Sequence, residues 1–227
     1  MEEIKVTIPS GWNELTVEQL QKIHEIRERN KPSTGATPSH INIQNSLDMV
    51  CYICQEEDSY VKEHLTVENY YKLAANLKWI QELPKSDKFD VIRRGYEFEG
   101  TTYCFSPLEK ITAHEYADIY QYIEQGQVEN LHKIISVLFR PIKRDKDGEP
   151  IILHVGDDSG VYAPMPYDSD EAEFRANIFK RLPSDVAHKL ADFFLFSLKI
   201  LELGFLTTSK ERDQIGETKQ RRAEQKT

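Results

Sequence analysis

A helix-start signal appears three times in this chain and constrains its fold more than any other feature. The copies are Leu15-Thr16-Val17-Glu18-Gln19-Leu20, Leu65-Thr66-Val67-Glu68-Asn69-Tyr70 and Ile111-Thr112-Ala113-His114-Glu115-Tyr116. In each, the Thr hydroxyl can accept a backbone N–H of the first turn. Gln19 and Glu115 can reach back to the Thr N–H as capping-box partners, and Asn69 does so less well. The flanking apolar residues are spaced as hydrophobic staples. We therefore predict that three helices begin near residues 16, 66 and 112.

Apolar residues at helical spacing extend this prediction over most of the chain. The polar segment 31–38 predicts a loop after the first helix, and Pro84 ends the third helix. The expected helices span residues 16–30, 46–57, 66–81, 112–124, 128–139, 169–181 and 184–203.

The period becomes alternating between residues 91 and 105. Large apolar residues there alternate with polar ones around Glu99-Gly100, which predicts a β-hairpin. A short strand is expected near residues 151–155. The Asp-, Gly- and Pro-containing segment 156–167 is expected to be an irregular excursion. The predicted fold class is mainly α, with helical domains, one small hairpin insertion and one further short strand.

Three regions are predicted along the chain. Residues 1–84 form an N-terminal helical region, and residues 85–206 form a hairpin plus a helical region packed with the first as one unit. Residues 207–227 are polar, lack apolar periodicity, and are expected to be a frayed helix or disordered. A hydrophobic content of 39% over 227 residues is enough for a real core.

Charge and cysteine usage restrict the class of protein. The net charge of −9 argues against sequence-independent nucleic-acid binding, which depends on neutralising phosphates with Lys and Arg. The N-terminus lacks the pattern of a signal peptide, and the apolar stretch 193–206 contains Lys199 and Glu202 and is too short to cross a bilayer. Three cysteines form no even disulfide framework, so we expect free thiols in a reducing compartment.

The pair Cys51 and Cys54, spaced as CxxC, is the one recognisable motif. A redox centre would place it at a helix N-terminus, but here it falls within a predicted helix. A zinc site would need two further ligands; His64 and Cys104 are available, without a second CxxC. We favour two small apolar residues on a core face, with a thiol or zinc site as the alternative.

Other polar clusters fit structural roles better than chemistry. His114, Glu115 and His132 could suggest acid–base work, but no nucleophile or orienting group accompanies them, and solvated or capping roles are favoured. Asp157, Asp158 and the acidic residues that follow lack the spacing of an EF-hand, so turn chemistry is the better account. We predict no catalytic residue and no cofactor or metal.

The run Phe193-Phe194-Leu195-Phe196 stands out among the apolar segments. Four consecutive large residues cannot share one helix face, because each residue turns the helix by about 100°. The segment is therefore either a core helix buried on several sides, which burial preferences favour, or a surface for a partner. The interface candidates are the aromatic residues that would anchor such a contact: Trp12, Phe193, Phe194, Phe196 and Phe205.

Three segments together resemble one family. They are residues 5–16, residues 111–118 and residues 130–141, the last ending in Leu-Phe-Arg-Pro. The combination resembles small virion-structure or assembly proteins encoded in the morphogenesis genes of tailed bacteriophages, especially the crAss-like phages of gut Bacteroides. The likeness covers most of residues 5–205, while the loop 145–167 has no counterpart in it. The resemblance implies helical proteins without cofactors that act by assembly.

We therefore expect a non-enzymatic structural component of a phage virion, at the neck or tail or carried as internal cargo. It would be made in the host bacterial cytoplasm and would bind other phage structural proteins, as a homo-oligomer or ring. One alternative is a tail-assembly chaperone that is not retained in the virion. The other is a CxxC thiol or zinc protein that uses Cys51 and Cys54.

Overall fold

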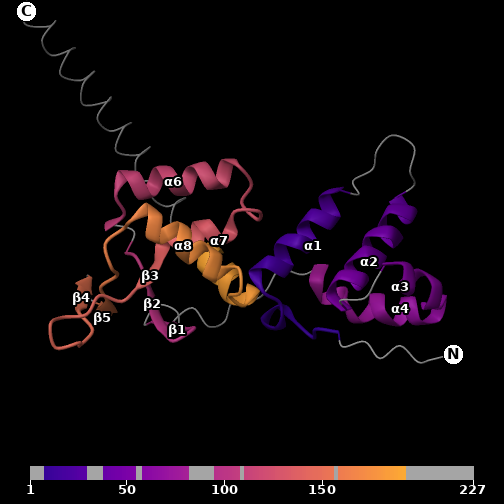
Figure 1. Ribbon diagram of the computed structural model, residues 1–227, viewed down its shortest axis with the longest axis horizontal. Coiled ribbons are helices and arrows are strands. Elements are labelled where there is room, and N and C mark those ends of the chain that lie inside the picture. Colours follow the sequence, from indigo (N-terminus) through magenta and orange to yellow (C-terminus); the bar gives the residue numbers. More distant parts are fainter. Residues whose placement is uncertain are drawn as a thin grey trace, which may run out of the picture. The chain divides into compact units, whose positions relative to one another are not determined.

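Helices make up most of the structure, and a small antiparallel sheet is inserted among them, as the sequence predicts (Figure 1). The computed structural model describes residues 8–29, 38–54, 58–81, 95–107, 110–155 and 158–192. The chain divides into two compact units, residues 1–189 and 190–227, and the architecture below is that of the first. No helix among the described residues has the length and apolar character needed to cross a bilayer.

The three predicted helix starts are confirmed. Helix α1 begins one residue after Thr16, whose N–H donates to Gln19 Oε1 at 2.9 Å and whose hydroxyl accepts from the Gln19 N–H at 3.2 Å. Thr66 accepts from the N–H of Asn69 at the start of α4. Thr112 and Glu115 form a complete capping box at the start of α6. The N-terminal elements are η1 (Trp12–Glu14), α1 (Val17–Arg29), α2 (Pro38–Cys54), α3 (Asp58–His64), α4 (Val67–Asn76) and η2 (Lys78–Gln81).

Two helix predictions in this region were incomplete. Helix α2 begins at Pro38 rather than near residue 46, because a proline at the first helical position has no N–H to leave unsatisfied. Helix α3 was not predicted, since its seven residues are too few to show a helical period.

Helices α1 to α4 share an apolar core. Its buried members come from the C-caps of η1 and α4, from α1, α2 and α3, and from η2: Leu15, Ile23, Val50, Cys51, Ile53, Val61, Leu77 and Ile80. Trp12 and Trp79 pack against this core, with ring centroids 5.2 Å apart and ring planes nearly perpendicular. Edge-to-face aromatic pairs of this kind add to the stabilisation from burial alone.

The predicted hairpin is confirmed and joins a third strand. Strands β1 (Tyr96–Phe98) and β2 (Thr101–Phe105) pair with Tyr96 opposite Tyr103, and the sheet order is β1-β2-β3. The sequence predicted that Arg140-Pro141 ends a helix at about residue 139, and α7 ends one residue earlier. The strand β3 (Phe139–Pro141), which pairs with β2, was not predicted.

Three helices complete this part of the chain: α6 (Ala113–Glu124), α7 (Leu131–Leu138) and α8 (Ser169–Phe179). Helix α7 packs against both α6 and α8 and is buried at every position except Lys133 (Figure 1). Phe139 and Phe179 are fully buried beside Tyr103 of β2. After α8 the chain is helical again over residues 184–192.

The strand expected near residues 151–155 is confirmed as β4 (Ile152–Val155). Residues 158–162, predicted to be irregular, instead form β5 (Asp158–Tyr162), which pairs with β4. The prediction failed because Asp, Ser and Gly are rare in strands, so these residues give no strand signal. The backbone N–H and C=O groups of β4 nevertheless need hydrogen-bond partners, and β5 supplies them. The chain then runs beside β3, where the Met165 N–H donates to the Pro141 carbonyl at 2.8 Å.

Candidate functional site

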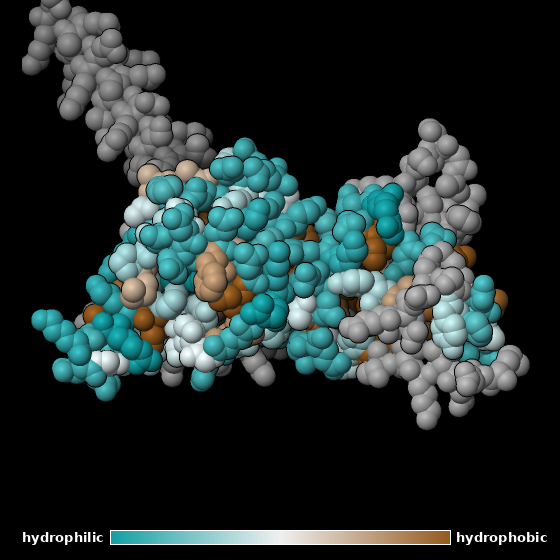
Figure 2. Space-filling model, in the orientation of Figure 1, coloured by the Kyte–Doolittle hydropathy of each residue, from teal (hydrophilic) through white to brown (hydrophobic). Residues whose placement is uncertain are grey.

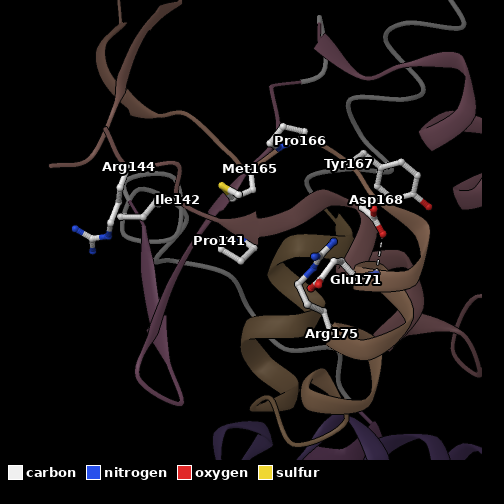
Figure 3. A pocket seen from close by; sticks show the side chains of 9 residues that line it. All are labelled: Pro141, Ile142, Arg144, Met165, Pro166, Tyr167, Asp168, Glu171 and Arg175. Atoms are coloured by element: carbon white, nitrogen blue, oxygen red, sulfur yellow. Dashed lines mark hydrogen bonds between the residues drawn. The ribbon is translucent and has the colours of Figure 1, made fainter. Parts of the chain in front are cut away.

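The candidate site is an open pocket of about 730 Å³ (Figure 3). Three segments that are far apart in the sequence form it: the end of β3 and the residues after it, the segment 165–168, and the first two turns of α8. Its lining residues are Pro141, Ile142, Arg144, Met165, Pro166, Tyr167, Asp168, Glu171 and Arg175. The volume is within the range of pockets that bind small molecules or a few side chains.

The start of α8 holds one wall of the pocket. Asp168 is its N-cap, and its Oδ1 accepts the N–H groups of Asp170 and Glu171 at 3.0 Å each. The partial positive charge of a helix N-terminus stabilises carboxylates in this position. The charges of Asp168 and Glu171 are therefore partly offset by α8 itself.

Arg175 is the buried charge of the pocket, with 5% of its surface exposed. Its Nε and Nη2 donate to the Ser136 carbonyl of α7, at 3.4 and 3.2 Å. In the view of Figure 3 its guanidinium lies between Pro141 and Glu171. Among the described residues, no carboxylate forms an ion pair with Arg175. Burial lowers the pKa of Arg175, and the neighbouring charge of Arg140 acts in the same direction.

Arg140, by contrast, has a buried counter-charge. Its Nη1 lies 2.9 Å from Glu115 Oε1, and the two side chains are 5% and 2% exposed. This contact is an ion pair without hydrogen-bond alignment, because Glu115 Oε1 has no hydrogen-bond partner. Glu115 Oε2 accepts the Thr112 N–H at 2.7 Å, and Arg140 Nη2 donates to Ser106 Oγ at 2.5 Å. The capping box of α6 is thus connected to the sheet through a buried ion pair.

Tyr167 connects the pocket rim to α6. Its hydroxyl donates to Asp118, whose Oδ2 lies 3.6 Å from Nε2 of His114. Burial and the bond to Asp118 raise the pKa of Tyr167, so the phenol stays protonated at neutral pH. The His114 ring packs edge-on against Tyr167, with centroids 5.5 Å apart. The contacts among Tyr167, Asp118 and His114 hold this part of the pocket rim against α6.

Two of the cysteines, Cys51 and Cys104, are buried. Cys51 is buried in the apolar core of α1 to α4, and Cys54 is the last residue of α2. Cys104 is fully buried, its thiol donates to the Tyr162 carbonyl at 3.5 Å, and burial raises its pKa to about 12. A thiol with a raised pKa is a poor nucleophile. In the ranges that the structure describes, no cluster of three His, Cys, Asp or Glu side chains could hold a metal ion.

The histidines and Glu115 are held apart by separate structural partners. Glu115 caps α6, as predicted, and His114 lies beside Asp118. His132 is buried, and its Nδ1 lies 2.8 Å from Nε2 of Gln21 on α1. The solvated or capping role that the sequence favoured does not fit His132, which is buried and contacts α1 from the start of α7.

Of the interface candidates, only Trp12 is within the described residues; Phe193, Phe194, Phe196 and Phe205 lie outside them. Trp12 is half-buried against Trp79 and His188. A role for these five residues in binding a partner stays a prediction.

The structure exposes other aromatic residues that the sequence reasoning missed. Phe174 of α8 is 66% exposed, and Tyr116 and Tyr120 of α6 stack on each other with centroids 6.1 Å apart, 39% and 46% exposed. Figure 2 shows apolar residues as separate patches on a largely hydrophilic face. The signal for Phe174 was present in the sequence: a large apolar residue beside Glu173 and Arg175, off the helical period of the buried Ala172, Ala176 and Phe179.

Comparison with protein-family models, curated proteins and solved structures finds no match for this chain.

Proposed function

We propose that the protein is a non-enzymatic structural component of a tailed-phage virion, at the neck or tail or as internal cargo, that acts by binding other proteins. The observation that carries the proposal is the exposure of Phe174 on α8. About two-thirds of the Phe174 side chain is exposed to water, so the fold does not gain the free energy that burial of this side chain would contribute. Aromatic side chains are enriched in protein interfaces relative to the rest of the surface.

The exposed tyrosines of α6 support the same reading. Tyr116 and Tyr120 lie one helical turn apart, so both rings face the same side of α6. Tyrosine is enriched in protein interfaces because its ring gives a large contact area while its hydroxyl tolerates water. Helices α6 and α8 thus each present aromatic side chains that a partner could cover.

The phage assignment rests on the sequence resemblance. Two of its segments have clear structural roles: residues 111–118 start α6, and residues 130–141 form α7 and β3. The first segment supplies Glu115 and the second Arg140 of the buried ion pair, and the second also lines the candidate pocket through Pro141.

Quantitative mass spectrometry of purified particles tests the proposal. A structural component should be present at a constant ratio to the major capsid protein after gradient purification, whereas an assembly chaperone should occur only in the lysate of infected cells. Absence from particles would overturn the virion assignment.

A surface variant tests the observation that carries it. Phe174→Ser should fold normally, because the side chain is exposed, but should be incorporated into particles several-fold less when it complements a deletion. Val67→Ser on α4, also at a strongly exposed apolar position, is the matched control. Equal incorporation of both variants and the unaltered protein would show that Phe174 is not a contact residue.

A further inference from the structure

The pocket between β3 and α8 combines a cavity with a buried cation. Arg175 is more than nine-tenths buried, yet its hydrogen bonds within the described residues go to a neutral carbonyl. A buried charge without a directly contacting counter-charge is costly, and such charges are usually paired. The charge of Glu171 acts on Arg175 against the effect of burial, but within the described residues the two side chains form no ion pair. Arg140 does not relieve this cost, since it carries the same sign and is itself paired with Glu115.

A second cation lies on the opposite side of the same pocket. Arg144 is exposed, and its Nη1 donates to the Gly148 carbonyl at 2.8 Å, whereas its other guanidinium nitrogens have no hydrogen-bond partner among the described residues. Glu171 and Asp168 also line the pocket, but they belong to the first turn of α8, whose N–H groups offset part of their charge. Between the two arginines lie apolar surfaces of Ile142, Met165 and two prolines.

We propose that this pocket receives an acidic side chain from an extended segment of a partner protein. The carboxylate would accept from the guanidinium of Arg175, with Arg144 adding attraction from the rim. Apolar residues beside the carboxylate would contact Ile142 and Met165. Arginine is suited to this role because its planar fork binds a carboxylate in a fixed geometry. The inference rests on the proposed function insofar as the occupant is a protein segment.

The test is a titration of the ¹⁵N-labelled full-length protein, followed by two-dimensional NMR. The ligands are the capped pentapeptide Leu-Pro-Glu-Pro-Leu, its twin with Gln in place of Glu, and butyrate. The Glu peptide should shift the Arg175 Nε–H and the amides of Ile142, Met165 and Glu171 in a saturable manner. The Gln twin should bind at least tenfold more weakly, as expected for loss of a charge-assisted hydrogen bond.

Two variants complete the design. Arg175→Gln should abolish the difference between the peptides, but the residue is buried and its replacement could unfold the chain. Arg144→Gln changes an exposed residue and should weaken the Glu peptide about threefold, in line with a partly screened charge. Lys146→Gln removes a charge from the same turn outside the pocket and should leave binding unchanged.

Equal shifts with the two peptides, or no shifts at these residues, would overturn the proposal. Butyrate binding as tightly as the Glu peptide would also overturn it, since the site would then serve a small free carboxylate. The result is independent of the particle measurements: absence of the protein from virions would refute the virion assignment and leave this titration unaffected.

Discussion

His132 shows how a single buried side chain makes stability depend on pH. Burial, with smaller contributions from Lys180 and Lys133, lowers its pKa to about 4, whereas an imidazole in an unfolded chain titrates near 6.5. Between these values the unfolded chain binds the additional proton. Stability from this residue is therefore complete above about pH 6.5 and is lost as the pH falls toward 4.

We expect His132 to lower the free energy of unfolding by about 2 kcal/mol between pH 7.5 and pH 5. Urea unfolding at the two pH values measures this change. In His132→Asn the pH dependence over this interval should shrink by a similar amount, even though the variant is less stable at pH 7.5. An unaltered pH dependence in the variant would mean that other groups cause it.

The buried pair of Glu115 and Arg140 gives a second prediction at this scale. Glu115→Gln keeps an oxygen for the Thr112 N–H but leaves the buried guanidinium without a counter-charge, so it should destabilise the fold by about 3 kcal/mol. Thr112→Ala removes only the cap and should cost about 1 kcal/mol. Denaturant unfolding separates the two. A Glu115→Gln cost no larger than that of Thr112→Ala would show that the ion pair contributes nothing beyond the cap.

Among the elements, the hairpin of β1 and β2 has a turn whose backbone conformation matches its two central residues. Glu99 and Gly100 have φ values of 47° and 74°, as a two-residue turn with both central residues left-handed requires. Glu99 also binds Arg181 through two hydrogen bonds of 2.7 Å. Both side chains are exposed, so this ion pair contributes little to the free energy of unfolding.

Gly100→Ala should therefore destabilise the protein by about 1 kcal/mol. The cost is purely conformational, because a Cβ at this position meets no atom within 4 Å. Thermal unfolding measures it, with the exposed β1 substitution Glu97→Ala as the control. Equal melting temperatures for Gly100→Ala and the unaltered protein would contradict the left-handed turn.

The same elements show what local sequence can predict. The Thr caps and the hairpin turn depend on residues within a few positions of one another, so the sequence predicted them. Strand β3 depends on a partner far away in the sequence, β2, and β5 pairs with the neighbouring β4 but contains Asp, Ser and Gly, which are rare in strands. The pocket also depends on contacts between distant segments. Its residue Arg144 precedes β4 in the sequence, whereas Arg175 follows β5. Spacing along the chain does not reveal that Arg175 is buried without an ion pair.

At the scale of the whole molecule, the first residues of the described chain are joined to those that follow α8. Thr16 forms a β-bridge with Pro183, and the Val17 N–H donates to the Leu182 carbonyl at 2.9 Å. Ser184 is fully buried; its N–H donates to the Leu15 carbonyl at 2.7 Å and its hydroxyl to the Trp12 carbonyl at 2.6 Å. These bonds connect the core of α1 to α4 with the end of α8.

This connection predicts that the two regions unfold together. Both tryptophans lie in the N-terminal part, so their fluorescence reports on that part, and the ring of Trp12 also on its contact with His188. Ser184→Ala removes one buried hydrogen bond and should lower the stability seen by tryptophan fluorescence by about 1 kcal/mol. Far-ultraviolet circular dichroism should show the same shift in the same transition.

Ser10→Ala is the matched control, because within the part of the chain that the structure describes the hydroxyl of exposed Ser10 bonds to exposed Glu14 alone. It should leave both signals unchanged. If Ser184→Ala shifted the circular dichroism transition but not the fluorescence, the contacts of Ser184 with Trp12 and Leu15 would not couple the regions. The helices α1 to α4 would then be a separately folding unit, and the bonds between Leu15 and Ser184 would be formed only after each region had folded by itself.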